Sequence, residues 1–169
     1  MLIQDFILPV DFNGLAIFSY PDLDKRLGGI HSGDNILQKF IETDLGDEVM
    51  DEGLIVPVIN MDDGDYIIRI FKDKSIDQNV EIKFQESGYP LKITQDAFVA
   101  DVVVFWDWEP ILGWKKININ PGFYSVDVHG VIHHKNGEHI AGYDFIFHEK
   151  NTLPIRTAKV REDSRVFNC

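Results

Sequence analysis

Residues 122–148 read GFYSVDVHGVIHHKNGEHIAGYDFIFH and carry the clearest structural signal in the chain. Asn136-Gly137 fits a two-residue turn between antiparallel strands, because both residue types accept positive φ angles. Counting outward from this turn pairs apolar residues with one another: Ile132 with Ala141, Val128 with Phe145, and Val126 with Phe147. The same register places His129 opposite Asp144, which predicts a polar, solvent-facing side. The segment therefore predicts a long β-hairpin.

A short motif of glycine and tyrosine occurs twice. Gly64-Asp65-Tyr66 opens one alternating strand, and Gly122-Phe123-Tyr124 opens another. A β-like run precedes each motif, at residues 53–59 and 113–119. The repeat predicts a hairpin-built module that the chain uses twice.

Further strand signals are spread along the chain, and no linker rich in Pro, Ser or Gly divides it. Strands are expected at residues 6–10, 15–20, 54–59, 66–71, 80–84 and 98–106. Asp11-Phe12-Asn13-Gly14 fits a tight hairpin turn between the first two. One short helix is expected over residues 35–43, capped by Ser32 or Asp34. We predict one domain over residues 1–169, an all-β antiparallel sandwich of about nine to eleven strands with one short helix in a connection.

Composition indicates a folded chain in a reducing compartment. The chain has 169 residues, of which 44% are hydrophobic, enough for a sizeable core. Its only cysteine is Cys169, so no disulfide can form within the chain. The first residues lack the pattern of a signal peptide, and no apolar run approaches the roughly 20 residues of a membrane span. We expect a cytoplasmic protein.

The charge of the chain is unevenly distributed. The formal net charge is −12. Residues 1–109 hold 22 acidic and 8 basic side chains, whereas residues 110–169 hold 6 and 8. Such a field repels nucleic acid and anionic membranes, and it attracts a basic protein partner. Acidity of this kind also serves solubility alone.

The densest acidic segment is residues 44–52. It contains five carboxylates: Asp44, Asp47, Glu48, Asp51 and Glu52. Packed carboxylates repel each other, so water or a cationic partner must screen them. Two interpretations remain open, a solvated loop and a docking surface for a basic protein. Asp62 and Asp63 in a neighbouring polar turn would extend such a surface.

Trp106 and Trp108 lie at the end of an apolar run, with one residue between them. Strand alternation would place both side chains on one face. Aromatic side chains there serve either the core or an interface with a partner. The flanking Asp107 and Glu109 argue against single-stranded nucleic acid as the ligand, because that ligand needs a basic groove.

No catalytic or cofactor signature is present. Phosphate loops, nucleophile elbows and cysteine pairs are all missing from the sequence. His134 and His139 face each other across the predicted hairpin, but the sequence offers no third ligand for a zinc ion. We therefore expect no cofactor, no bound metal and no enzymatic activity.

The turn and strand motifs resemble those of a known group of proteins. Asn120-Pro121-Gly122-Phe123-Tyr124 and Asp63-Gly64-Asp65-Tyr66 each lead from a turn into an alternating strand. In a small acidic β-protein, this arrangement resembles bacterial nuclease inhibitors of the competence-protein-J type and the immunity proteins of toxin systems. The resemblance covers residues 50–150. It implies a cognate toxin, often a nuclease whose basic channel is blocked by an acidic surface.

The sequence thus leads to a specific expectation and an alternative. The expectation is an immunity or inhibitor protein that binds a basic protein toxin through an acidic surface, without nucleic acid or membrane as a direct ligand. Its expected contacts are Asp44, Asp47, Glu48, Asp51, Glu52, Asp62, Asp63, Trp106 and Trp108. The alternative is a β-sandwich module that binds a small ligand or serves as a structural subunit.

Overall fold

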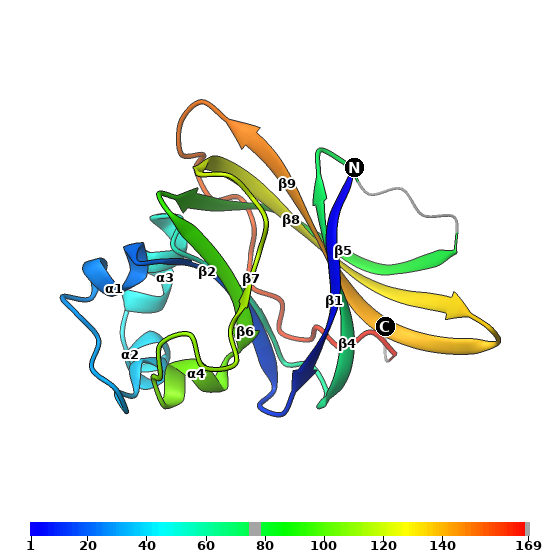
Figure 1. Cartoon of the computed structure of the whole chain (residues 1–169), viewed down its shortest axis with the longest axis horizontal. Coiled ribbons are helices and arrows are strands. Elements are labelled where there is room, and N and C mark those ends of the chain that lie inside the picture. Colours follow the sequence, from blue (N-terminus) through cyan, green and yellow to red (C-terminus); the bar gives the residue numbers. More distant parts are fainter. Residues whose placement is uncertain (75–78, 168–169) are drawn as a thin grey trace.

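A computed structural model describes residues 1–74 and 79–167, and these residues are mostly β (Figure 1). Its strands are β1 (Leu2–Val10), β2 (Gly14–Tyr20), β3 (Ile55–Ile59), β4 (Gly64–Lys72), β5 (Val80–Ile93), β6 (Asp96–Asp101), β7 (Lys115–Lys116), β8 (Gly122–Lys135) and β9 (Glu138–Lys150). Its helices are α1 (Asp22–Arg26), α2 (Ile36–Glu42), α3 (Leu45–Asp51) and α4 (Val103–Trp106). Cys169 lies outside the described residues.

The strands form two sheets. The five-stranded sheet has the order β1-β4-β9-β8-β5, and the four-stranded sheet has the order β3-β2-β6-β7. Neighbouring strands are antiparallel except β4 and β9, which run parallel. The expectation of a mostly β fold is confirmed. The expectations of a single helix and of purely antiparallel pairing are wrong, because four short helices and one parallel pair are present.

Strand β2 is apolar on both of its faces, so both faces need to be covered. Leu15 and Ile17 alternate with Ala16 and Phe18, and all four are fully buried. Phe18 packs against Phe105 of α4 with ring centroids 5.2 Å apart. The four helices lie together on the left in Figure 1, beside the four-stranded sheet. Helices covering one face of this sheet keep both faces of β2 from water.

The predicted hairpin is confirmed residue by residue in β8 and β9. Val126 pairs with Phe147, Val128 with Phe145, and Lys135 with Glu138. The prediction of a solvent-facing opposite side is wrong at Asp144, which is 1% exposed. The parallel strand β4 lies beside β9 and sets Arg69 next to Asp144. The guanidinium donates to both carboxylate oxygens at 2.7 and 2.5 Å, which compensates the buried charge.

The repeated glycine and tyrosine motif forms corners between the sheets rather than hairpins. The first copy carries the chain from β3 to β4, and the second carries it from β7 to β8. The Tyr66 hydroxyl donates to the carbonyl of Asp62, and the Tyr124 hydroxyl donates to that of Asn120 at 2.6 Å. Each tyrosine thus ties its strand to the turn four residues earlier, as in the tyrosine corners of other β-proteins.

Removing the corner hydroxyl by Tyr124→Phe is expected to lower the free energy of unfolding by about 1 kcal/mol, because the hydrogen bond is lost while the buried ring remains. Chemical denaturation of the two proteins measures this difference. Tyr20→Phe is the matched control, because the Tyr20 hydroxyl has no hydrogen bond to any residue in 1–74 or 79–167. Equal losses for both variants would contradict the role of the corner.

The connection between β1 and β2 also differs from the expected hairpin. β1 pairs with β4 and β2 pairs with β3 and β6, so the two strands belong to different sheets. Asn13 has the positive φ of 63° that the sequence indicated. A sharp turn was therefore predicted correctly, but it joins the sheets instead of closing a hairpin.

The expected helix is present as α2, although its cap is a different residue. The Asn35 side chain accepts a hydrogen bond from the Gln38 amide at 3.1 Å, in place of Ser32 or Asp34. The expected strand over residues 98–106 is shorter than predicted, because β6 ends at Asp101 and α4 follows.

The C-terminal segment, residues 151–167, contains no helix or strand. The Thr157 amide donates to the Gly88 carbonyl of β5, and the Ser164 amide donates to that of Asn60. The Tyr143 hydroxyl of β9 donates to the Ser164 carbonyl at 2.6 Å. The segment therefore links β5 and β9 to the turn that follows β3.

Candidate protein-binding surface

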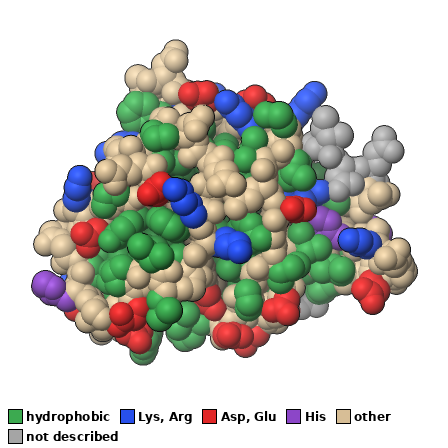
Figure 2. Space-filling model, viewed as in Figure 1, with side chains coloured by type: hydrophobic (Ala, Val, Ile, Leu, Met, Phe, Trp, Pro, Cys, Tyr) green, Lys and Arg blue, Asp and Glu red, His purple; other side chains and the backbone are tan. Residues whose placement is uncertain are grey.

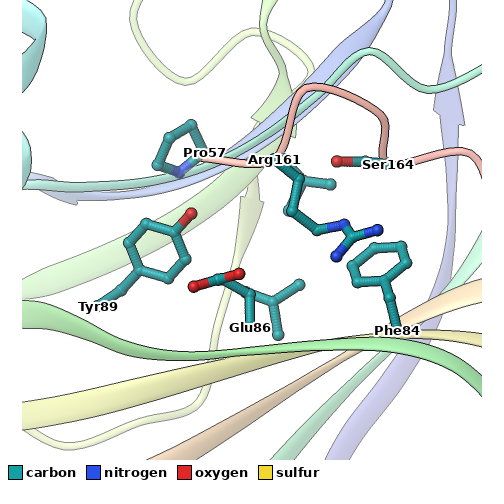
Figure 3. Close-up of a pocket in the computed structure, with 8 residues that line it drawn as sticks. Pro57, Phe84, Glu86, Tyr89, Arg161 and Ser164 are labelled. Atoms are coloured by element: carbon teal, nitrogen blue, oxygen red, sulfur yellow. The ribbon is translucent and has the colours of Figure 1, made fainter. Parts of the chain in front are cut away.

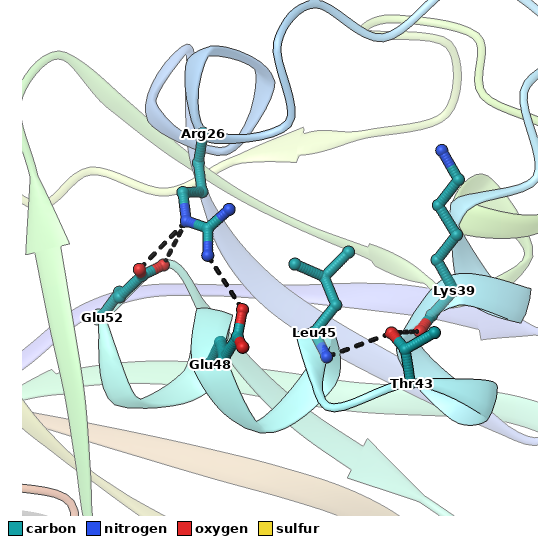
Figure 4. A network of polar contacts seen from close by, with 6 residues as sticks. All are labelled: Arg26, Lys39, Thr43, Leu45, Glu48 and Glu52. Carbon is teal, nitrogen blue, oxygen red and sulfur yellow. Dashed lines mark hydrogen bonds and ion pairs between the residues drawn. The ribbon is translucent and has the colours of Figure 1, made fainter.

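The acidic segment 44–52 folds mostly as helix α3, not as the loop that one interpretation expected. Arg26 of α1 forms ion pairs with Glu52 at 2.8 Å and with Glu48 at 3.0 Å (Figure 4). These carboxylates raise the pKa of Arg26, with Glu52 the larger cause. Two of the five carboxylates are therefore screened by a cation from the same chain.

A second arginine screens the other side of α3. Arg156 of the C-terminal segment lies 2.6 Å from the Asp51 carboxylate and 3.6 Å from that of Asp47. Asp44 precedes the helix and is exposed, with no cation bonded to it among the described residues. The sequence could not reveal these pairings, because Arg156 is 105 positions from Asp51. Most of the acidic helix is thus satisfied internally.

A second acidic group lies where three connections meet. The Met61 amide donates to the Asn13 carbonyl at 3.3 Å, and the Asn13 side chain donates to that of Asn60 at 3.2 Å. The Asp11 amide donates to the Asp101 carboxylate at 2.7 Å. These bonds bring the turns after β1, β3 and β6 together on the lower side of the molecule in Figure 1.

Two exposed aromatic side chains pack together at this junction. Phe12 and Trp106 have ring centroids 5.8 Å apart, and they are 39% and 53% exposed. Large aromatic side chains usually bury their apolar area, so an exposed pair is a candidate contact for a partner. Trp108 does not join them, because it is fully buried against Phe18 and Trp114. The expectation that Trp108 contacts a partner is corrected, since it belongs to the core.

The carboxylates around the aromatic pair lack partners within the described chain. Asp11, Asp62 and Asp63 are exposed, and no Lys, Arg or His in residues 1–74 or 79–167 forms an ion pair with them. Burial is the largest cause of the raised pKa of Tyr66. The negative charges of Asp62 and Asp63 raise it further. Acidic and hydrophobic side chains lie together along the lower edge in Figure 2.

We define the corner surface as these five residues: Asp11, Phe12, Asp62, Asp63 and Trp106. Sequence reasoning identified three of them and missed Asp11 and Phe12. The available signal was the aromatic residue inside the polar turn Asp11-Phe12-Asn13-Gly14. Large apolar side chains are usually buried, so an exposed phenylalanine is not needed by a turn that only closes a hairpin.

A cavity between β5 and the C-terminal segment is too small for a substrate (Figure 3). Its volume is about 10 Å³, the space of one water molecule. The Arg161 guanidinium, which lines this cavity, lies over the Phe84 ring, 4.1 Å from the ring centroid. Burial raises the pKa of Tyr89, which lines this cavity, to about 12.

The histidines of the hairpin end do not assemble into a metal centre in the described part of the chain. His134 and His139 face each other with ring centroids 4.7 Å apart, as the register predicts. Glu81 lies 3.4 Å from His134. Among residues 1–74 and 79–167, no three His, Cys, Asp or Glu side chains are placed to hold a metal ion.

No helix in the described ranges is long and apolar enough to cross a membrane.

Comparison with known proteins shows the fold. The chain matches no protein-family model, and no curated protein matches its sequence. The structure is similar to that of ComJ from Bacillus subtilis, described as an inhibitor of the DNA degrading activity of NucA. The TM-score is 0.55 at 10% identity, over 89% of this chain and 98% of ComJ.

A second solved structure with this fold is described as crocagin biosynthetic gene J. It has a TM-score of 0.51 and 14% identity, over 86% of this chain and 96% of that protein. The resemblance to competence-protein-J inhibitors, which the turn and strand motifs indicated, is thereby confirmed for the fold.

Proposed function

We propose that this protein is an inhibitor that binds a basic enzyme, specifically a toxin nuclease, and covers the enzyme's nucleic-acid cleft with the corner surface. The observation that carries this proposal is the exposed pair of Phe12 and Trp106 among carboxylates without a cation in the described chain. Aromatic anchors inside a charged border are typical of protein interfaces.

Electrostatics favours a nuclease as the partner. A nuclease must present a positive cleft to phosphate groups, so an acidic inhibitor competes for the same field and associates quickly. The net charge of −12 adds long-range attraction to a basic protein. The corner carboxylates form no ion pair within the described chain, whereas Arg26 and Arg156 already pair with Glu48, Glu52 and Asp51 of the α3 segment.

The fold supports the same proposal. ComJ inhibits a DNA-degrading protein, and we extend that role to this chain as an inhibitor without catalytic residues of its own. Inhibition by occlusion requires a complementary surface and no active site. The absence of a catalytic motif in the sequence is consistent with this role.

The test is a pull-down from lysate of the source cells at low salt and at roughly 0.5 M salt, where the Debye length falls to a few ångströms. We expect a basic protein that is retained at low salt and released at high salt. The purified partner should degrade DNA, and an equimolar amount of this chain should stop that activity.

Two triple variants locate the binding surface at equal change in net charge. One variant neutralises Asp11, Asp62 and Asp63 to asparagine, and it should lose the partner. The other neutralises Glu48, Asp51 and Glu52 to the corresponding amides, and it should keep the partner because these groups are already paired. Retention by the first and loss by the second would move the site to α3. Capture of no basic protein would contradict the inhibitor role.

A further inference from the structure

An apolar groove opens between helices α2 and α3 and the edge of the four-stranded sheet. Its volume is about 160 Å³, and every side chain that lines it is apolar. Phe40 and Ile41 come from α2, Val49 and Met50 from α3, and Ile59 from β3. Ile41 at its border is 74% exposed.

A tight turn sets the positions of the two helices that line the groove. The Thr43 hydroxyl donates to the Lys39 carbonyl at 2.5 Å and accepts from the Leu45 amide at 3.2 Å, so a tight turn joins α2 to α3 (Figure 4). Gly46 then packs against the end of α2, where an added Cβ would lie 2.5 Å from the Phe40 carbonyl oxygen. The connection between the helices is therefore tightly packed, and β3 is the outermost strand of the four-stranded sheet in the described chain.

The border of the groove is acidic. A second hollow shares Phe40, Ile41 and Met50 with the groove and is also lined by Glu42, Asp44 and Asp47. In the described residues, Glu42 and Asp44 have no ion pair, and Asp47 has only the 3.6 Å contact with Arg156. An occupant with an apolar centre and positive flanks would therefore be complementary to this site.

The groove is continuous with the corner surface. Ile59 lines the groove, and the turn that carries Asp62 and Asp63 begins at the next residue. Phe105 lines it from α4, and Trp106 follows directly. A partner bound to the corner surface would thus also lie next to the opening of the groove.

We propose that the groove receives one large apolar side chain, flanked by lysine or arginine, from a basic segment of the partner protein. This inference rests on the proposed inhibitor function and names the anchor of that interface. A dry apolar cavity of roughly 150 Å³ holds one benzene molecule, so a phenylalanine side chain matches the volume. A buried anchor in a pocket that excludes water is the usual centre of a protein interface.

Three pentapeptides test the chemistry of the groove by NMR titration into the isotope-labelled full chain. The first has a central phenylalanine between two pairs of lysines, the second replaces the phenylalanine by alanine, and the third replaces the lysines by glutamates. We expect the first to shift amides of α2, α3 and β3, the second to bind about tenfold more weakly, and the third not to bind.

Ile41→Lys should weaken binding of the first peptide about tenfold, since it places a positive charge at the mouth of the groove. Lysine is a good helix former, so α2 should persist, and thermal unfolding checks this. Ile7→Lys is the matched control on β1 in the other sheet, where Ile7 is 56% exposed. It should leave binding unchanged.

Equal binding of the phenylalanine and alanine peptides, or shifts confined to the corner surface, would overturn the groove as an anchor site. The inhibitor function would then still stand if the pull-down retains a basic nuclease. Binding in the groove without any captured partner would support the groove and overturn the inhibitor. The two proposals therefore fail on different measurements.

Discussion

Asp144→Asn is expected to lower the free energy of unfolding by about 3–5 kcal/mol, the usual loss when one partner of a buried ion pair is removed. Arg69 and Asp144 have side chains that are 8% and 2% exposed, so water cannot replace the lost carboxylate. The change preserves the shape of the side chain and removes its charge. Denaturation followed by circular dichroism measures the difference.

Two further variants separate the charge effect from packing. Lys72 and Glu149 form an exposed pair on the same two strands, 3.7 Å apart, so Glu149→Gln should change stability little. The double variant Arg69→Met with Asp144→Leu should recover much of the loss, because apolar residues often replace a buried pair without cost. A small loss for Asp144→Asn alone would show that this pair is not critical for the β4–β9 pairing.

Trp106→Ala is expected to weaken binding of the captured partner by about 2 kcal/mol, on the order of thirtyfold, because tryptophan at the centre of an interface carries a large share of the binding energy. The free chain should lose little stability, since the ring is 53% exposed. Isothermal titration calorimetry with the purified partner measures the dissociation constant for each variant.

Phe167→Ala is the matched control, because Phe167 is an aromatic residue of similar exposure, 55%, that does not belong to the corner surface. It should bind the partner as well as the unaltered chain does. Unchanged affinity for Trp106→Ala would remove the aromatic pair from the interface, and equal losses for both variants would indicate a general effect of aromatic truncation.

The β8–β9 hairpin was predictable to the residue because local chemistry alone specifies it. A two-residue Asn-Gly turn fixes the register, and any shift would mix apolar and polar faces. The burial of Asp144 was not predictable in the same way. It depends on β4, whose parallel pairing brings in Arg69 from 75 positions away.

The corners show a different limit of sequence reasoning. Asn13-Gly14 and the Gly-x-Tyr motifs require sharp turns, and such turns serve hairpins and connections between sheets equally well. Which of the two occurs depends on distant partners: β1 pairs with β4, and β2 pairs with β6. The sequence therefore predicts where the chain turns but not which strand it then meets.

Sequence reasoning found only part of the candidate site, because the local conformation and the distant partners were not visible in the sequence. Trp106 and Trp108 share a face only in an extended strand, but residues 103–106 form α4, so one ring becomes exposed and the other enters the core. A short apolar run does not distinguish strand from helix. Likewise, the neutralisation of α3 depends on Arg26 and Arg156, which only the fold brings to it.

The sheet edges carry a consequence for self-association. Each edge strand has an interruption that discourages open-ended strand addition: Pro9 in β1, Pro57 in β3, Pro90 in β5, and a two-residue β7 made of Lys115 and Lys116. Proline lacks the amide that a newly docked strand would need, and lysine resists aggregation into continuous sheets. Strand addition at these edges is therefore disfavoured, and any protein that binds this chain is expected to contact its side chains rather than pair with its backbone.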